Sequence, residues 1–471
     1  MQQKEHGRQF LENRIYTEIA IGDTSSLVRT LRPEDIQLFA VMTGDVNPAI
    51  VDQEFANSGI FREVIAHGMW SASLISTVLG TQYPGPGTIL VDQSLQFLRP
   101  VTIGDTITIT ITVKQKFDHN HHVLFDCSCT NQDGIQVIGG TVEALAPREK
   151  VKRERIALPD ILISDKRGRY DQLLAKTRGL PPIDMAVAHP CDVESLRGAL
   201  LAAEAGLIEP ILVGPENRIR AIAEEHGFDI SQHRIVNVKH SHESAAMAVT
   251  LVRNGDADAL MKGSLHTDEL MGEIVSRAGG LRTGRRLSHV FVMDVPTYPK
   301  PLLITDAAIN IAPTLEEKVH IIQNAIELAH DLGRPDPKVA ILSAVETVNP
   351  KIESTLHAAA LCKMADRGQI KGGVLDGPLA FDNAISFVAA KTKGIKSAVA
   401  GDADILVVPD LESGNMVAKQ LEYLANALTA GVVLGASAPI VLTSRADTAE
   451  TRTASCAIAA LIAHAKRKAA A

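Results

Sequence analysis

The chain changes its hydrophobic pattern once, between about Ala146 and Ser164, and this change limits what it can fold into. Upstream of it, apolar and polar residues alternate with a period of two, in Asp105–Val113, His122–Cys129 and Ile135–Leu145. Such alternation is typical of half-buried strands in an antiparallel sheet. Downstream, short apolar runs alternate with helical segments. The sequence therefore predicts two regions of different fold class.

The junction between the two patterns is a charged run, Pro147–Arg155, followed by Pro159. A run of this kind is usually a solvated connector. We therefore predict a first domain at residues 10–147, a charged linker at 148–164 and a second domain at 165–471.

Two predicted helices interrupt the strands of the first region. One is Pro33–Thr43, with proline in its first turn, and the other starts after His67. A helix of this kind beside a long antiparallel sheet indicates an α+β domain in which the helix packs on the sheet.

The second region reads as alternating strands and helices. Its apolar strands include Ala257–Met261, Val339–Leu342 and Ile405–Val408, and helical spacing is clear in Thr314–Leu332. This order predicts a doubly wound, mainly parallel sheet with ligands at the carboxyl ends of strands. Because roughly 310 residues exceed one comfortable core, we expect two lobes with a cleft between them.

Composition excludes several classes of function. The formal charge of −8 shows no general basic excess, so we expect no nucleic-acid partner. The five cysteines include no CxxC pair, which indicates free thiols in a reducing compartment and no metal site. The N-terminus has no signal-type apolar core and no run of 18 apolar residues occurs, so we expect a cytoplasmic protein without a membrane partner.

Polar and small residues directly follow an apolar strand, and precede a helix, in five segments of the second region. Phosphate and carboxyl groups bind at such junctions, where helix N–H groups are exposed. The segments are Ala259–Thr267, Leu303–Asn310, Val374–Asn383, Val407–Asn415 and Val441–Asp447.

These segments, in this order, resemble the signature blocks of the phosphate acetyl/butyryltransferases. The resemblance implies a two-lobed, isopropylmalate-dehydrogenase-like α/β subunit. It also implies that a short acyl group, acetyl or butyryl, is exchanged between coenzyme A and inorganic phosphate, by thiolate attack on the acyl phosphate in a ternary complex. The expected partners are acyl-CoA and phosphate, and no cofactor is implied beyond coenzyme A as part of the substrate.

Acyl transfer to phosphate needs an anion clamp, a donor to the carbonyl oxygen and a base for the thiol. Arg445 is the predicted clamp and Ser444 the predicted donor. The family has an Asp seven residues after the Ser, where this chain has Thr451, so Glu450 is predicted as the base and Asp447 is the other candidate. The predicted phosphate and coenzyme A ligands are Lys262, Ser264, Asp306, Asn310, Asp376, Asp382 and Asn415. Helix capping is the alternative for Asp306 and Asp382.

The first region resembles the MaoC-like hotdog domains, which hydrate 2-enoyl-CoA thioesters. Thr43–Pro48, Ala66–Met69 and Phe97–Val101 carry the resemblance. The implied thioester site is Asp45, Asn47, His67 and Gly68.

The family pairs its Asp with a His five residues later, and here that position is Ile50. Loss of one member of an acid/base pair makes acyl transfer the predicted main function, with enoyl-CoA hydration as the alternative. A non-enzymatic pair of acyl-CoA binding modules is a third alternative. Homo-oligomers are expected, because both resembled folds pair through two-fold contacts.

Overall fold

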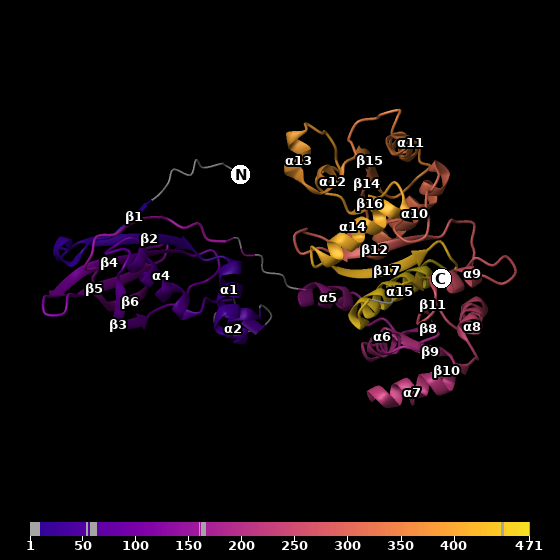
Figure 1. Ribbon diagram of the computed structural model, residues 1–471, viewed down its shortest axis with the longest axis horizontal. Helices are drawn as coiled ribbons and strands as arrows, with labels where there is room; N and C mark the ends of the chain where they lie inside the picture. The colour runs from indigo at the N-terminus through magenta and orange to yellow at the C-terminus, as the bar shows by residue number, and fades with distance from the viewer. Residues whose placement is uncertain are drawn as a thin grey trace. The chain divides into compact units, whose positions relative to one another are not determined.

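The computed structural model describes residues 10–52, 55–56, 64–159, 161, 166–443 and 447–470. The chain divides into two compact units, residues 1–163 and residues 164–471 (Figure 1). Each unit has its own hydrophobic core.

The N-terminal unit is built on a five-stranded antiparallel sheet of order β2-β4-β5-β6-β3. The strands of the sheet are β2 (Thr24–Thr30), β3 (Ile89–Phe97), β4 (Thr106–Phe117), β5 (His122–Thr130) and β6 (Gln136–Leu145). A separate short pair joins β1 (Phe10–Glu12) to β7 (Lys152–Glu154). The helices are η1 (Tyr16–Glu18), α1 (Pro33–Thr43), α2 (Pro48–Val51) and α4 (Gly68–Thr81).

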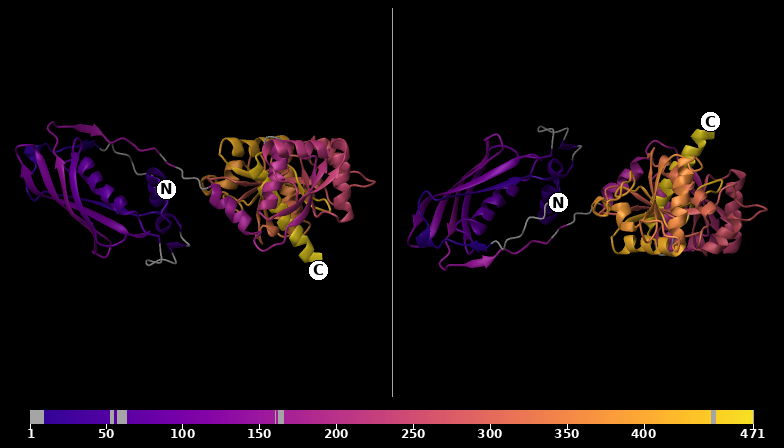
Figure 2. Two further views of the ribbon diagram at one scale, coloured as in Figure 1. Left: turned by 90° about the horizontal axis from the view of Figure 1, so that it is seen from below. Right: turned by 90° about the horizontal axis from the view of Figure 1, so that it is seen from above.

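Strand β4 shows why this sheet forms. Ile107, Ile109 and Ile111 are fully buried, and the threonines between them are half-buried on the other face. Helix α4 covers the apolar face and buries Trp70 and Ile75 against it (Figure 2). The predicted α+β hotdog fold is confirmed.

The C-terminal unit contains one sheet of eleven strands, ordered β10-β9-β8-β11-β18-β17-β12-β13-β16-β14-β15. Its strands are β8 (Ile183–Ala188), β9 (Ile208–Gly214), β10 (Arg234–Asn237), β11 (Ala259–Lys262), β12 (Ser288–Asp294), β13 (Leu302–Thr305), β14 (Lys338–Leu342), β15 (Val374–Leu379), β16 (Ile405–Val407), β17 (Leu428–Leu434) and β18 (Ile440–Val441).

The five strands from β10 to β18 are parallel to one another, and so are the four from β13 to β15. Strands β17 and β12 lie between these two blocks and are antiparallel to both neighbours. The two predicted lobes are therefore halves of one continuous sheet. The predicted doubly wound, mainly parallel architecture is confirmed.

Helices cover both faces of this sheet (Figures 1 and 2). They are α5 (Lys166–Ala175), α6 (Val193–Glu204), α7 (Glu216–His226), α8 (Ser241–Asn254), α9 (Thr267–Ile274), α10 (Leu315–Asp331), α11 (Glu353–Asp366), α12 (Phe381–Ile385), α13 (Phe387–Thr392), α14 (Leu411–Tyr423) and α15 (Ala449–Ala470). Helix α15 packs against both halves, because its small residues contribute to the cores on either side of β17. None of the helices within the described residues is long and apolar enough to cross a membrane.

Candidate active site

The turn after β11 holds the first predicted ligand. Lys262 ends the strand and is 3% exposed, and its Nζ lies 3.4 Å from the carbonyl oxygen of Gly263. A Cβ on Gly263 would stand 2.5 Å from the carbonyl oxygen of Ala188 and 2.6 Å from that of His189. Only glycine therefore fits, and the amides of Gly263 and Ser264 donate to those same two carbonyls.

Arg452, which was not predicted from the sequence, is the largest fully buried side chain, with 1% of its surface exposed. Its Nη1 donates to Thr443 Oγ1 at 2.7 Å and to the carbonyl oxygen of Lys262 at 3.5 Å. Burial lowers the pKa of Arg452, and the charges of Asp192 and Asp447 oppose that effect. Gly198 on α6 makes room for it, because a Cβ there would lie 2.7 Å from Arg452 Cδ.

Asp192, the N-cap residue of α6, lies close enough to Arg452 for its charge to affect the Arg452 pKa. Its carboxylate caps α6 through the Ser195 amide at 2.7 Å and accepts a hydrogen bond from the Ser264 side chain. Burial alone would raise the pKa of Asp192, but these hydrogen bonds outweigh burial and hold it below its usual value. We call the group Lys262, Ser264, Asp192, Thr443 and Arg452 the polar cluster.

Predicted residues Ser444 and Arg445 lie outside the described residues. After them, Asp447 is 7% exposed and lies 3.9 Å from Lys419 Nζ on α14. The α15 N-terminus is fixed by Glu194, whose Oε2 accepts from the Ala449 amide at 3.1 Å.

The two candidate bases have different surroundings. Asp447 is buried, and its negative charge favours the protonated, higher-pKa form of both Arg452 and Lys419. Glu450 is exposed in the first turn of α15, and its charge acts on Tyr170 of α5, whose pKa is raised chiefly by burial.

Asp306 and Asn310 organise the loop after β13. Asp306 is 2% exposed and accepts the amides of Ala308 and Ile309, both at 3.0 Å, and that of Asn310 at 3.2 Å. Asn310 Oδ1 in turn accepts from Arg286 Nε at 2.7 Å. These bonds hold the loop and keep Arg286 beside it, and Asp306 does not cap a helix, because α10 is capped by Thr314.

Asn415 joins α14 to this loop, because its Nδ2 donates to the carbonyl oxygen of Ala307 at 3.2 Å. Buried His289 on β12 lies between the loop and β18. Burial lowers its pKa while the charge of Asp306 opposes this, and its Nε2 lies 3.4 Å from the carbonyl oxygen of Leu442.

Asp376 and Asp382 lie elsewhere, on and just after edge strand β15. Asp376 accepts a hydrogen bond from the Gly377 amide at 2.8 Å. Burial raises the pKa of Cys362 on α11, and the negative charge of Asp376 raises it further. Asp382 is exposed and lies 3.5 Å from Lys393 Nζ. The structure thus brings Lys262 and Ser264 together, places Asp306, Asn310 and Asn415 in a second group, and puts Asp376 and Asp382 in neither.

The predicted site of the N-terminal unit is compact. His67 Nε2 lies 3.4 Å from Asp45 Oδ2, and His67 Nδ1 accepts the Met69 amide at 3.0 Å. The Asn47 side chain caps α2, and the backbone N–H of Asn47 donates a hydrogen bond to Asp45 Oδ1. Gly68 is the first residue of α4, and Ile50 is buried in the core.

Sequence signals for the missed residues were present but weak. Arg452 is a single cation in a stretch of small residues, and Asp192 follows β8 just as the predicted ligands follow their strands. Among the described residues no group of three or more His, Cys, Asp or Glu could hold a metal ion. A doubly wound sheet with buried cations at its strand ends is typical of α/β enzymes that bind anionic substrates.

Comparison with known proteins narrows this class. The family model described as phosphate acetyl/butaryl transferase matches residues 240–460, and the MaoC like domain model matches residues 18–128. A phosphate acetyltransferase of Rhizobium meliloti is 63% identical over 302 residues, which are 64% of this chain and 95% of the relative. A phosphate butyryltransferase of Clostridium beijerinckii is 43% identical over 62% of this chain and 97% of its own length.

Among solved structures, a branched-chain phosphotransacylase from Enterococcus faecalis V583 is 32% identical. It covers 60% of this chain and 99% of its own, with a TM-score of 0.54. The chain belongs to the phosphate acetyl/butyryltransferase family and carries a MaoC-like domain ahead of the transferase region. It is therefore an acyltransferase.

Proposed function

We propose that the C-terminal unit transfers a short acyl group, acetyl or butyryl, between coenzyme A and inorganic phosphate. In one direction phosphate oxygen attacks the thioester carbonyl and coenzyme A leaves. In the other, the coenzyme A thiolate attacks the acyl phosphate and phosphate leaves. The observation that carries the proposal is the presence of two buried cations, Lys262 at the end of β11 and Arg452 on α15, in a chain of this family.

The sequence assigns the anion clamp to Arg445 and the carbonyl donor to Ser444, which follow Thr443 directly. Lys262 adds positive charge, and Arg452 positions the Lys262 and Thr443 strand ends by bonding to both. Buried cations stabilise negative charge on phosphate and on the carbonyl oxygen more strongly than exposed ones, because the local dielectric is low.

The base that deprotonates the thiol is either Glu450 or Asp447. The surroundings of Asp447 favour it, because it is buried beside Lys419 and acts on Arg452, whereas Glu450 is exposed and acts on Tyr170. A general base has to lie within reach of the proton that it removes.

The test is release of free thiol when purified protein receives acetyl-CoA or butyryl-CoA with phosphate. We expect phosphate-dependent release, and an Arg445→Ala variant should lose phosphate use with a raised Michaelis constant for phosphate. Absence of phosphate-dependent thiol release with every short acyl-CoA would refute the proposal.

A second candidate function is hydration of 2-enoyl-CoA by the N-terminal unit, with acyl transfer remaining the main activity. It is favoured by the 3.4 Å approach of His67 Nε2 to Asp45 Oδ2, both about one third exposed, because His67 could replace the acid/base partner absent at Ile50. Loss of crotonyl-CoA absorbance would measure it, and an Asp45→Asn variant that hydrates as fast as the parent chain would remove Asp45 from the site.

We also propose that the chain is a cytoplasmic homo-oligomer. Edge strand β3 and the residue after it expose large apolar side chains, including Ile89 at 59%, Phe97 at 52% and Leu98 at 50%. Exposed apolar patches of this kind are typical of association surfaces. Light scattering that gives the mass of a single 50.4 kDa chain would contradict oligomerisation.

A further inference from the structure

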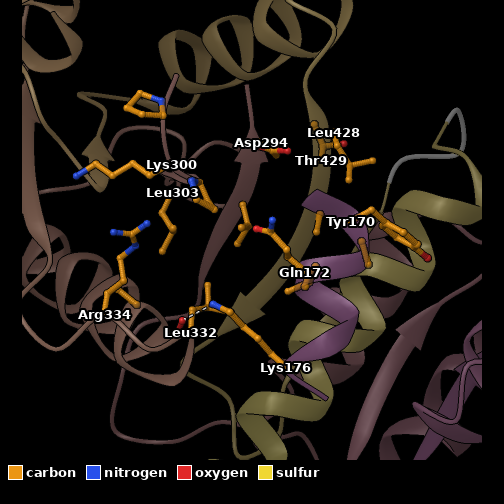
Figure 3. A pocket seen from close by; sticks show the side chains of 17 residues that line it. Tyr170, Gln172, Lys176, Asp294, Lys300, Leu303, Leu332, Arg334, Leu428 and Thr429 are labelled. Carbon is orange, nitrogen blue, oxygen red and sulfur yellow. Dashed lines mark hydrogen bonds between the residues drawn. The ribbon is translucent and has the colours of Figure 1, made fainter. Parts of the chain in front are cut away.

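A cavity of about 510 Å³ lies under α5, away from the polar cluster. Its apolar lining comes from the sheet and from α5, α10 and α15, and includes Leu173, Leu303, Ala329, Leu428 and Ala454. This volume is within the range of about 300–1,000 Å³ that is usual for small-molecule sites. Figure 3 shows Lys300 and Arg334 along one wall and Tyr170 on the wall opposite.

The charged groups of the cavity are mostly cations. Lys176, Lys300 and Arg334 line it, together with one carboxylate, Asp294. Lys300 is paired with Asp402 at 2.9 Å and with Asp404 at 2.8 Å. Arg334 shares Asp404 at 3.1 Å, which brings the two cations together.

With the carboxylates that bond to the lining residues, three cations face three carboxylates among the described residues. The cations are Lys176, Lys300 and Arg334, and the carboxylates are Asp294, Asp402 and Asp404. Asp402 and Asp404 are paired with Lys300 and Arg334, so a ligand with one negative charge is favoured beside Lys176.

Lys176 is the lining cation that lies outside these ion pairs. Its ammonium donates to the carbonyl oxygen of Leu332 at 2.8 Å, and no described carboxylate pairs with it. Partial desolvation and the nearby charge of Arg334 lower its pKa. An anion bound here would relieve the repulsion between Lys176 and Arg334 and would complete the hydrogen bonding of the ammonium group.

We propose that this cavity binds a small monocarboxylate with an apolar body, at a site distinct from the acyl-transfer site. The carboxylate meets Lys176 and Arg334, and the hydrocarbon contacts Leu303 and Ala454. Inorganic phosphate fits less well, because much of the lining is apolar.

The lining of the cavity includes no residue of the polar cluster, and neither Asp447 nor Lys419. Its strand residues Val292 and Leu303 belong to the core that also contains α10 and α15 residues. A ligand in the cavity therefore makes no contact with the polar cluster.

The test is a calorimetric titration of the full chain with hexanoate, with coenzyme A and phosphate present at saturation to occupy the acyl-transfer site. Hexanamide, which has the same shape without the charge, is the ligand control. We expect hexanoate to bind at least about tenfold more tightly than hexanamide, as a charge-assisted hydrogen bond requires.

Lys176→Met should weaken hexanoate binding by about tenfold or more, and Lys176→Arg should restore most of it. Lys363→Met is the matched control, because Lys363 is an exposed lysine on α11 outside the cavity. The proposal is overturned if hexanoate and hexanamide bind equally, if coenzyme A and phosphate abolish hexanoate binding, or if the Lys176→Met variant binds hexanoate as tightly as the Lys363→Met control does.

Discussion

At the residue scale, the identity of the thiol base is the main chemical question. Asp447→Asn should lower kcat by about 10²-fold or more, as loss of a general base does, while Glu450→Gln should change kcat by less than about threefold. The reason is that Asp447 is buried beside Lys419, whereas Glu450 is exposed. Steady-state rates of acyl phosphate breakdown by coenzyme A measure both variants, and the opposite order would assign the base to Glu450.

Asp331 at the end of α10 gives a pH-dependent prediction. Burial, and after it the charge of Glu327, raises the pKa of Asp331 from 3.8 to about 6. Because the folded-state pKa is raised, its contribution to stability is fully present below pH 3.8 and is lost as the pH rises through about 6. At pH 7 the ionised carboxylate therefore opposes folding, by about 1–2 kcal/mol once solvent screening of this partly exposed group is taken into account.

Asp331→Asn should accordingly raise the free energy of unfolding at pH 7.5 and leave it nearly unchanged at pH 4. Denaturant unfolding at the two pH values, followed by a probe in the C-terminal unit, measures this difference. Asp366→Asn at the exposed end of α11 is the control and should show no such dependence. A gain in stability that is equal at both pH values would contradict the prediction.

At the scale of elements, the turn after β11 positions Lys262 and Ser264. Gly263→Ala should destabilise the fold by about 1–3 kcal/mol, because its Cβ would meet two carbonyl oxygens closer than 3.0 Å. The variant should also lose acyl transfer, since the same turn carries Lys262. Gly272→Ala in α9 is the control: nothing lies within 4 Å of its Cβ, so alanine should stabilise the helix by about 0.5–1 kcal/mol. Thermal unfolding and thiol release test both, and a Gly263→Ala variant as stable and active as the parent would be inconsistent with this turn.

The sequence predicted elements with a strong local signal. Helix α1 has the predicted bounds, because Pro33 starts it and Gly44 ends it in a left-handed conformation. The sequence did not predict that β17 and β12 join the two lobes into one sheet, because strand direction depends on long-range pairing. Arg452 was missed for a related reason: its burial depends on space left by Gly198, which is more than 250 positions away.

At the scale of the whole molecule, the described part of the acyl-transfer site belongs to the C-terminal unit. The polar cluster, Asp447 and Lys419 all lie within residues 164–471, and the Rhizobium meliloti relative is matched over 95% of its length by about the same number of residues. A unit with its own hydrophobic cores can fold alone.

The predicted domain 165–471, expressed alone, should therefore keep kcat and the Michaelis constant for phosphate within about threefold of the full chain, as expected for an independent domain. The predicted domain 10–147 alone should release no thiol with phosphate, and any crotonyl-CoA hydration should remain with it. Circular dichroism establishes that each fragment is folded before the rates are compared. A folded 165–471 fragment that loses more than about tenfold in kcat would mean that the N-terminal unit completes the acyl-transfer site, and Asp45 and His67 would then be the first residues to substitute in the full chain.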